Sequence, residues 1–331
     1  MKKPLAILIE PGPAGIIIPL LIGGVFWLTG YFISPEPDWS APKITPFTEW
    51  VNTIIPVHSA LSHSLGFLFT ILIGLILVQF NETFSFIRTR TLLPLFFFIL
   101  LMGSNINVHE FSFGQISCFF LLLALWQLFS IYQEKSPVKQ TFNIGFFLSL
   151  GSFFTIELVF FLPIFWLGMM RLNSFRFRTF LSSIIGFLSP FLLFLGVAYL
   201  QSDVVNYIKL FVEQFNFELN FFNYNFIFIL YLGTLIVCAL FAILNLVNKS
   251  FSDKIKVSRI LGFISMSFIF CLLLFLFFSD KSSIVFTFAA IFGSILYAHY
   301  FSLHYNLFIR VLFWIQLSIS LLYYLYSIFF S

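Results

Sequence analysis

Residues 141–178, TFNIGFFLSLGSFFTIELVFFLPIFWLGMMRLNSFRFR, decide how the apolar segments of this chain are arranged. Two short apolar stretches flank a polar break at Thr155 and Glu157, and a basic turn at 171–178 follows. A helix that crosses a bilayer needs about 20 apolar residues, so this stretch forms either one long helix or two short ones. Two short helices in a hairpin are preferred, because one long helix would reverse every later segment and separate the basic clusters at 171–178 and 249–259 from the other basic loops.

The composition defines the class of protein. Of the 331 residues, 60% are hydrophobic, 21% are aromatic and only 9% are charged. Soluble domains carry about 25% charged residues, so the composition excludes a water-soluble fold. The three cysteines lie in or beside apolar stretches without metal-ligand spacing, and we assign them no disulfide or metal. We predict an all-α, polytopic helical bundle in a membrane.

The remaining apolar runs predict the other membrane segments. Together with the hairpin they give about eleven segments in a single membrane domain, residues 1–331. The predicted runs lie near 15–33, 64–80, 92–103, 116–132, 181–200, 226–247, 259–279, 283–299 and 309–329. Within this domain we distinguish a core at 1–200, an outer amphipathic segment at 201–225 and C-terminal helices at 226–331.

The basic residues alternate along the chain. Fourteen of the seventeen Lys and Arg residues fall in every second gap between the predicted segments. These are Lys2, Lys3, Arg88, Arg90, Lys135, Lys139, Arg171, Arg176, Arg178, Lys249, Lys254, Lys256, Arg259 and Arg310. Only Lys43, Lys209 and Lys281 lie in the other gaps. The positive-inside rule therefore predicts a cytoplasmic N-terminus. The net charge of +4 reflects this topology and contact with membrane lipids, and we expect no nucleic-acid partner.

Two outer segments are longer than a simple connection requires. The first, 34–63, reads SPEPDWSAPKITPFTEWVNTIIPVHSALSH, and the second, 201–225, reads QSDVVNYIKLFVEQFNFELNFFNYN. Apolar residues recur at helical spacing in both, which predicts amphipathic helices lying on the outer surface of the membrane.

Candidate functional residues lie on this outer side. Glu36 and Asp38 flank a proline just after the first predicted segment, where two carboxylates could bind a divalent cation or act as a general base. His109 and Glu110 occupy the second outer loop. A polar turn without chemistry is the competing interpretation in both places.

Three further polar residues, His58, His63 and Glu157, are candidates on the same side. His58 and His63 could contact a phosphate, although ordinary interfacial histidines are the competing interpretation. Glu157, at the hairpin tip, should reach the outer surface or face a protein-lined cavity, because a carboxylate at bilayer depth costs about 3 kcal/mol.

The arrangement resembles the GT-C membrane glycosyltransferases, which transfer sugars from polyprenyl-phosphate carriers on the extracytoplasmic side. A long first outer loop bearing acids, an acid in the second outer loop and the stretch at 142–195 carry this resemblance. The chain departs from that family in having no basic residue in GSFFTIE, at 151–157. Most of residues 5–250 also resemble a family of integral membrane proteins from Bacteroidota, through the short helix at 92–94 and ALWQLF at 124–129.

The resemblance implies a site and a location. It implies a bacterial inner-membrane protein in which Glu36 or Asp38 is the base, while Glu110 and His109 position the acceptor, the phosphate or a divalent cation. The metal ligands would be Asp38 and Glu110. The remaining residues implied to bind substrate are His58, His63, Lys43, Glu157 and Lys209.

Two other functions remain open from the residues alone. A non-catalytic scaffold or assembly subunit of a cell-envelope complex would use the aromatic spans and outer helices to contact protein partners. A transporter is the third alternative, although transporters commonly place ionisable groups within their spans, and Glu157 is the only acid here far from a loop.

Overall fold

The computed structural model describes residues 12–33, 51, 54–55, 59–87, 89–200, 205, 209, 211, 225–249, 255–278, 281–303 and 307–330. These residues form eleven α-helices, and eight of them are long and apolar enough to cross a membrane. The helices are α2 (Pro13–Ile33), α4 (Ala60–Phe84), α5 (Leu93–Ser104), α6 (Phe113–Ser130), α7 (Val138–Ser152), α8 (Phe161–Arg171), α9 (Phe177–Leu200), α11 (Phe226–Lys249), α12 (Ile255–Phe277), α13 (Ser282–Leu303) and α14 (Leu307–Phe330). The prediction of an all-α, multi-pass membrane protein is confirmed at this level.

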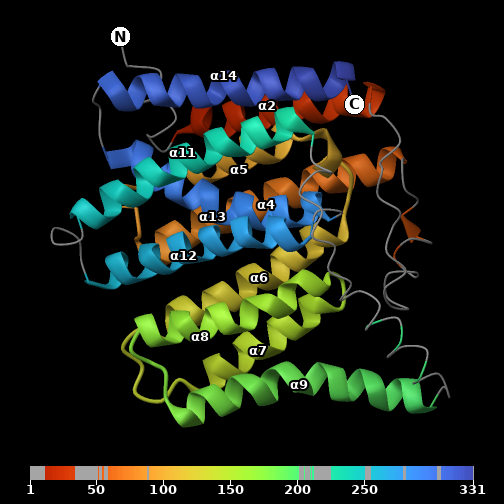
Figure 1. The fold of residues 1–331 in the computed structure, drawn as a ribbon, viewed down its shortest axis with the longest axis vertical. Helices are drawn as coiled ribbons and strands as arrows, with labels where there is room; N and C mark the ends of the chain where they lie inside the picture. The colour runs from red at the N-terminus through yellow and green to blue at the C-terminus, as the bar shows by residue number, and fades with distance from the viewer. Residues whose placement is uncertain are drawn as a thin grey trace.

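Successive helices run in opposite directions, so their connections collect at two ends of the bundle (Figure 1). At one end, Arg176 Nη1 donates to the carbonyl of Lys135 at 3.2 Å, and Lys256 Nζ lies 5.8 Å from the Tyr132 ring. We call this the basic end, because α4, α6, α8, α11 and α13 all end there and the turns after α6 and α8 carry Lys135 and Arg176. The other end, which we call the opposite end, carries Glu110 and Glu157.

The predicted break at 155–157 is confirmed. The helix α7 ends at Ser152, a 3₁₀ turn η2 covers Ile156–Phe160, and α8 returns toward the basic end. With 15 and 11 residues, α7 and α8 are roughly 22 and 16 Å long, each shorter than a bilayer core of about 30 Å. The hairpin therefore gives the later helices the direction that the distribution of basic residues predicts.

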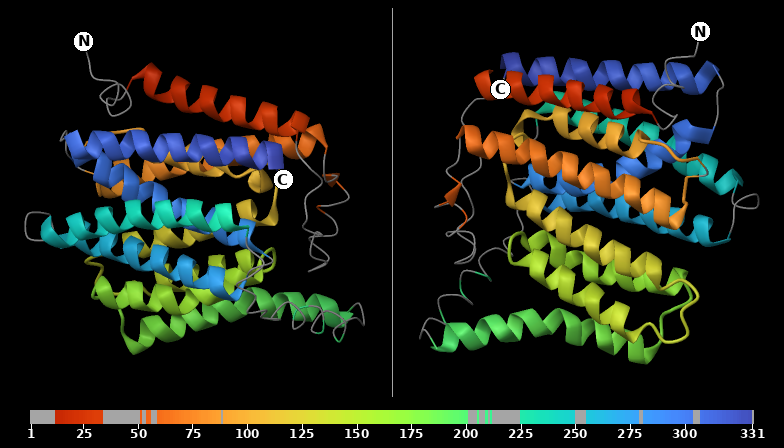
Figure 2. Two further views of the ribbon diagram at one scale, coloured as in Figure 1. Left: turned by 45° about the horizontal axis from the view of Figure 1, so that its top comes forward. Right: turned by 180° about the vertical axis from the view of Figure 1, so that it is seen from behind.

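Glycines let α7 pack closely against α9. A Cβ on Gly145 would meet the backbone of Ser183, and one on Gly186 would meet the backbone of Phe142. Small residues at such crossings allow close helix packing in membranes, where burial of apolar surface gives little driving force. In the two views of Figure 2, α9 lies along one edge of the bundle, with α2 and α14 toward the opposite edge.

The centre of the bundle is formed by α5 and α13. Every residue of α5 is buried, α13 is almost entirely buried, and the two helices pack against each other. Hydrogen bonds connect this centre to α11, since Ser104 Oγ lies 2.7 Å from Tyr231 Oη and Tyr297 Oη donates to the Leu235 carbonyl at 2.7 Å. The C-terminal helices thus share one core with the N-terminal ones.

One predicted boundary is wrong. The first outer segment was expected to extend to residue 63, but α4 begins at Ala60. Ser59 caps this helix, because its Oγ accepts from the backbone N–H of Ser62 at 3.0 Å. His63 therefore lies in the first turn of α4 and is buried. The amphipathic helices predicted within the outer segments 34–63 and 201–225 lie largely outside the described residues.

Candidate functional site

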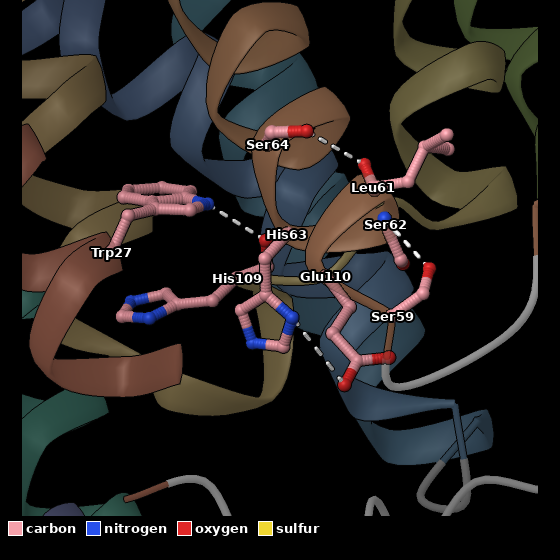
Figure 3. Close-up of polar contacts among 8 residues, drawn as sticks. All are labelled: Trp27, Ser59, Leu61, Ser62, His63, Ser64, His109 and Glu110. Carbon is pink, nitrogen blue, oxygen red and sulfur yellow. Dashed lines mark hydrogen bonds and ion pairs between the residues drawn. The ribbon is translucent and has the colours of Figure 1, made fainter. Parts of the chain in front are cut away.

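A buried histidine–carboxylate pair lies at the opposite end of the bundle. His63 Nδ1 is 3.9 Å from Glu110 Oε1, and the two side chains are only 6% and 8% exposed. His63 comes from the first turn of α4, and Glu110 comes from the turn between α5 and α6 (Figure 3). The fold thus brings together two predicted site residues that lie 47 positions apart in the sequence.

Backbone contacts hold Glu110 against α4. The short 3₁₀ turn η1 (Ile106–Val108) precedes it, and the backbone N–H of Phe111, directly after it, donates to the Ser62 carbonyl at 3.1 Å. Gly66 faces this turn so closely that a Cβ there would collide with the His109 carbonyl and approach the backbone of Glu110. The position of the carboxylate therefore depends on a glycine one turn after Ser62 in α4.

His109 points away from Glu110. Its fully buried ring stacks on Trp27 at a centroid distance of 4.4 Å, and the Trp27 indole N–H donates to the His109 carbonyl at 2.7 Å. Figure 3 shows His109 directed toward Trp27, while Glu110 points toward His63. The predicted joint action of His109 and Glu110 on one bound group therefore finds no support in this arrangement, and His109 contributes to the site through packing.

The surroundings of His109 keep it neutral. Its Nε2 lies 2.9 Å from the Gly103 carbonyl, which can only accept, so Nε2 carries the proton. Burial lowers the pKa of His109 to about 4, although the Gly103 hydrogen bond opposes the shift and nearby His63 adds to it. No described residue is a hydrogen-bond partner of Nδ1. A neutral, buried imidazole is suited to a structural role at physiological pH.

A polar strip continues from the pair into the bundle. Gln115 Nε2 in α6 donates to the Gly66 carbonyl at 3.3 Å and lies 3.5 Å from Thr70 Oγ1. Gln115 and Thr70 are both fully buried. Sequence reasoning missed Trp27, Gln115 and Thr70, because a single polar or aromatic residue within an apolar helix carries no signal of its neighbours.

Glu157 belongs to a second polar pair. It is fully buried in η2, and its Oε1 lies 3.0 Å from Nζ of Lys281, which is 25% exposed in the turn before α13. Glu157 therefore does not reach the surface. Lys281, from the turn before α13, stabilises the buried carboxylate. Lys281 is one of only three basic residues predicted on the outer side of the membrane. It was therefore a candidate partner for Glu157 from the sequence alone.

The other predicted site residues have different outcomes. Glu36, Asp38, Lys43 and His58 lie outside the described residues, and Lys209 is exposed. Among the residues described, no three His, Cys, Asp or Glu side chains gather closely enough to hold a metal ion. The part of the predicted site that the structure assembles is thus the His63–Glu110 pair.

Comparison of the chain with protein-family models, curated proteins and solved structures found no match. The geometry at the opposite end of the bundle is therefore the basis for assigning a function.

Proposed function

We propose that this protein is a GT-C-like glycosyltransferase of the bacterial inner membrane that acts at the opposite end of the bundle, on the extracytoplasmic side. The observation that carries the proposal is the buried His63–Glu110 pair. A carboxylate held beside an imidazole in a poorly hydrated site is a suitable general base. The basic residues at the other end favour an extracytoplasmic location for this pair.

The first outer segment begins and ends beside this pair. Tyr31, near the end of α2, contacts the His63 ring at a centroid distance of 5.2 Å, and α4 begins three residues before His63. Asp38 is five residues beyond Ile33, so an extended chain places it within about 17 Å of the end of α2. This short connection to α2 supports the proposal that Glu36 and Asp38 act together with Glu110.

The proposed reaction is sugar transfer from a polyprenyl-phosphate carrier. An acceptor hydroxyl would attack the anomeric carbon, the bond from that carbon to the phosphate oxygen would break, and polyprenyl phosphate would leave. Glu110 would take the hydroxyl proton, and His63 would orient the carboxylate. If a divalent cation takes part, Glu110 and His63 offer one oxygen and one nitrogen ligand, with Asp38 as the predicted third.

Replacing Glu110→Gln tests this proposal, because the amide keeps the size of the side chain but is not a base. In cells whose only copy of the protein is this variant, we expect the rate of sugar transfer to fall at least 100-fold. A loss of this size is within the range for removal of a general base. Mass spectrometry of lipid-linked sugars and envelope glycans measures the accumulated donor and the lost product. Glu82→Gln, an exposed position near the basic end of the same α4, is the matched control and should leave both unchanged.

A scaffold or assembly subunit of an envelope complex is the second candidate. The Glu157–Lys281 pair favours it, since this charged contact joins two parts of the bundle and offers no base to a substrate. For a scaffold, Glu110→Gln should leave the glycan profile unchanged at normal protein abundance. That result would contradict the transferase proposal.

A further inference from the structure

A groove runs between α11 and α14 on the membrane-facing side of the bundle, and it shares no residue with the His63–Glu110 pair. Its volume is about 500 Å³, within the usual range for small-molecule sites. The side chains at its rim are apolar and partly exposed, including Ile229, Val237 and Ile315. Because both helices are candidate membrane spans, the groove opens toward lipid.

The dimensions of the groove fit a single chain. On α11 its lining extends from Phe226 to Cys238, roughly 18 Å along the axis, which is about half of a 30 Å bilayer core. A groove of this length and volume accommodates one hydrocarbon chain, whereas an α-helix with its side chains is about 10–12 Å across. The groove therefore begins at the opposite end of the bundle and reaches the middle of the membrane.

Gly233 leaves the centre of the groove open. A Cβ built on this glycine meets no atom within 4 Å, so the space beside it is free. A larger side chain at this position would enter the groove without displacing its neighbours.

A buried amide lies in the wall of the groove. Gln316 of α14 is only 3% exposed, and none of the described residues is a hydrogen-bond partner of its Nε2. It is ten residues into a 24-residue helix, so it lies within a few ångströms of mid-membrane depth. An unpaired amide N–H in hydrocarbon is unfavourable, so an occupant that offers an acceptor at this depth would be stabilised.

Depth restricts the chemistry of the occupant. The ester oxygens of phospholipids lie at the membrane interface, far from Gln316, and a plain hydrocarbon chain has no acceptor. We propose that the α11–α14 groove binds a neutral isoprenoid lipid with a ring carbonyl, of the prenylated-quinone class. The carbonyl accepts from Gln316 Nε2, and the isoprenoid chain lies along the apolar groove past Gly233.

The test uses the full-length protein in phosphatidylcholine nanodiscs, titrated with menaquinone-4 and, separately, with squalene, an isoprenoid that has no carbonyl. The melting temperature measured against ligand concentration reports binding to the folded state. We expect saturable stabilisation by menaquinone-4 in the wild type and no saturable effect of squalene. Gln316→Leu should raise the half-saturating concentration about tenfold, as expected for the loss of one hydrogen bond.

Gly233→Leu should abolish the saturable effect, because the leucine fills the groove. Gly24→Leu in α2 is the matched control, since a Cβ there also meets no atom within 4 Å, and it should bind as the wild type does. Equal responses to menaquinone-4 in Gly233→Leu and Gly24→Leu would overturn the assignment of the groove. Saturable binding of squalene with the same affinity, or no saturable binding of menaquinone-4, would overturn the carbonyl-lipid class.

Discussion

At the scale of single residues, glycines that lack a side chain determine where the Glu110 carboxylate lies. Gly66 allows the turn that carries Glu110 to lie directly on α4, and Gly30 leaves room for the His109 ring beside α2. His109 in turn stacks on Trp27 and holds the end of α5 through the Gly103 carbonyl. The position of the pair thus depends on residues that have no chemistry of their own.

Gly66→Ala should destabilise the protein by about 1–3 kcal/mol, because the added methyl group overlaps the His109 carbonyl and forces the turn away from α4. Thermal unfolding in detergent measures this change. Gly24→Ala is the control, since its Cβ would meet open space, and it should melt at or slightly above the wild-type temperature. Equal melting temperatures for the two variants would show that the turn does not depend on Gly66.

The buried His109 should make the stability of the protein depend on pH. Its folded pKa of about 4 lies below the ordinary value of 6.5, so the unfolded chain binds a proton that the folded chain excludes. Stability is therefore highest above pH 6.5 and falls as the pH drops toward 4, by about 3 kcal/mol in total. His109→Phe keeps a ring against Trp27 but cannot titrate.

Melting temperatures of wild type and His109→Phe, compared at pH 7.5 and pH 4.5, measure this contribution. The wild type should lose more stability over this interval than the variant does. The same loss in both proteins would assign the pH dependence to other groups.

At the scale of elements, two connections far apart in the sequence are held together by charge. The η2 turn supplies Glu157 and the turn before α13 supplies Lys281, so the ion pair joins the α7–α8 hairpin to the C-terminal helices. The Phe160 and Phe278 rings pack against each other nearby, with their centroids 5.6 Å apart. This contact fixes the tip of the hairpin against the rest of the bundle.

Lys281→Met should destabilise the protein by about 3–5 kcal/mol, because it leaves the buried Glu157 carboxylate without a cation. The double variant Glu157→Gln, Lys281→Met removes both charges and should recover most of that loss. Thermal melting of both single variants, the double variant and the wild type forms a double-mutant cycle. Additive effects, with no recovery in the double variant, would exclude a direct interaction between the two side chains.

At the scale of the whole molecule, the antiparallel order of the helices separates the basic turns from the polar pairs. Glu110 and Glu157 lie in the turns after α5 and after α7, whereas Lys135 and Arg176 lie in the turns after α6 and after α8, at the other end of the bundle. Figure 1 shows these two ends. The orientation of the chain in the membrane therefore determines which compartment the His63–Glu110 pair faces. Labelling of cysteines placed at the two ends can test the proposed orientation.

Asn225→Cys, at the opposite end, should react with a membrane-impermeant maleimide in intact spheroplasts, whereas Ser136→Cys, at the basic end, should react only after permeabilisation. Both positions are exposed, and the native cysteines are buried, so the background should be low. The reversed pattern would place the His63–Glu110 pair in the cytoplasm and contradict the proposed extracytoplasmic transferase.

Much of the fold follows from local sequence. The membrane class, the predicted apolar runs and the alternation of basic gaps all derive from composition and order along the chain, and the helices lie close to the predicted runs. The hairpin around 155–157 follows from the positions of the basic residues, since one long helix would place the later basic clusters on the other side of the membrane. The apolar run alone predicts a start of α4 that is too late, because an apolar run does not reveal the capping hydrogen bond of Ser59.

The sequence by itself determined that this chain is a bundle of apolar helices with its cations at alternate turns. The reason is that each span in lipid must form its own backbone hydrogen bonds, which only a helix provides within one segment. Only the tertiary structure decided which polar groups meet. It joined His63 to Glu110 and Glu157 to Lys281, and it turned His109 inward against Trp27. Such contacts depend on how helices rotate and cross, and in a chain this uniformly apolar a few glycines and buried polar groups set that packing.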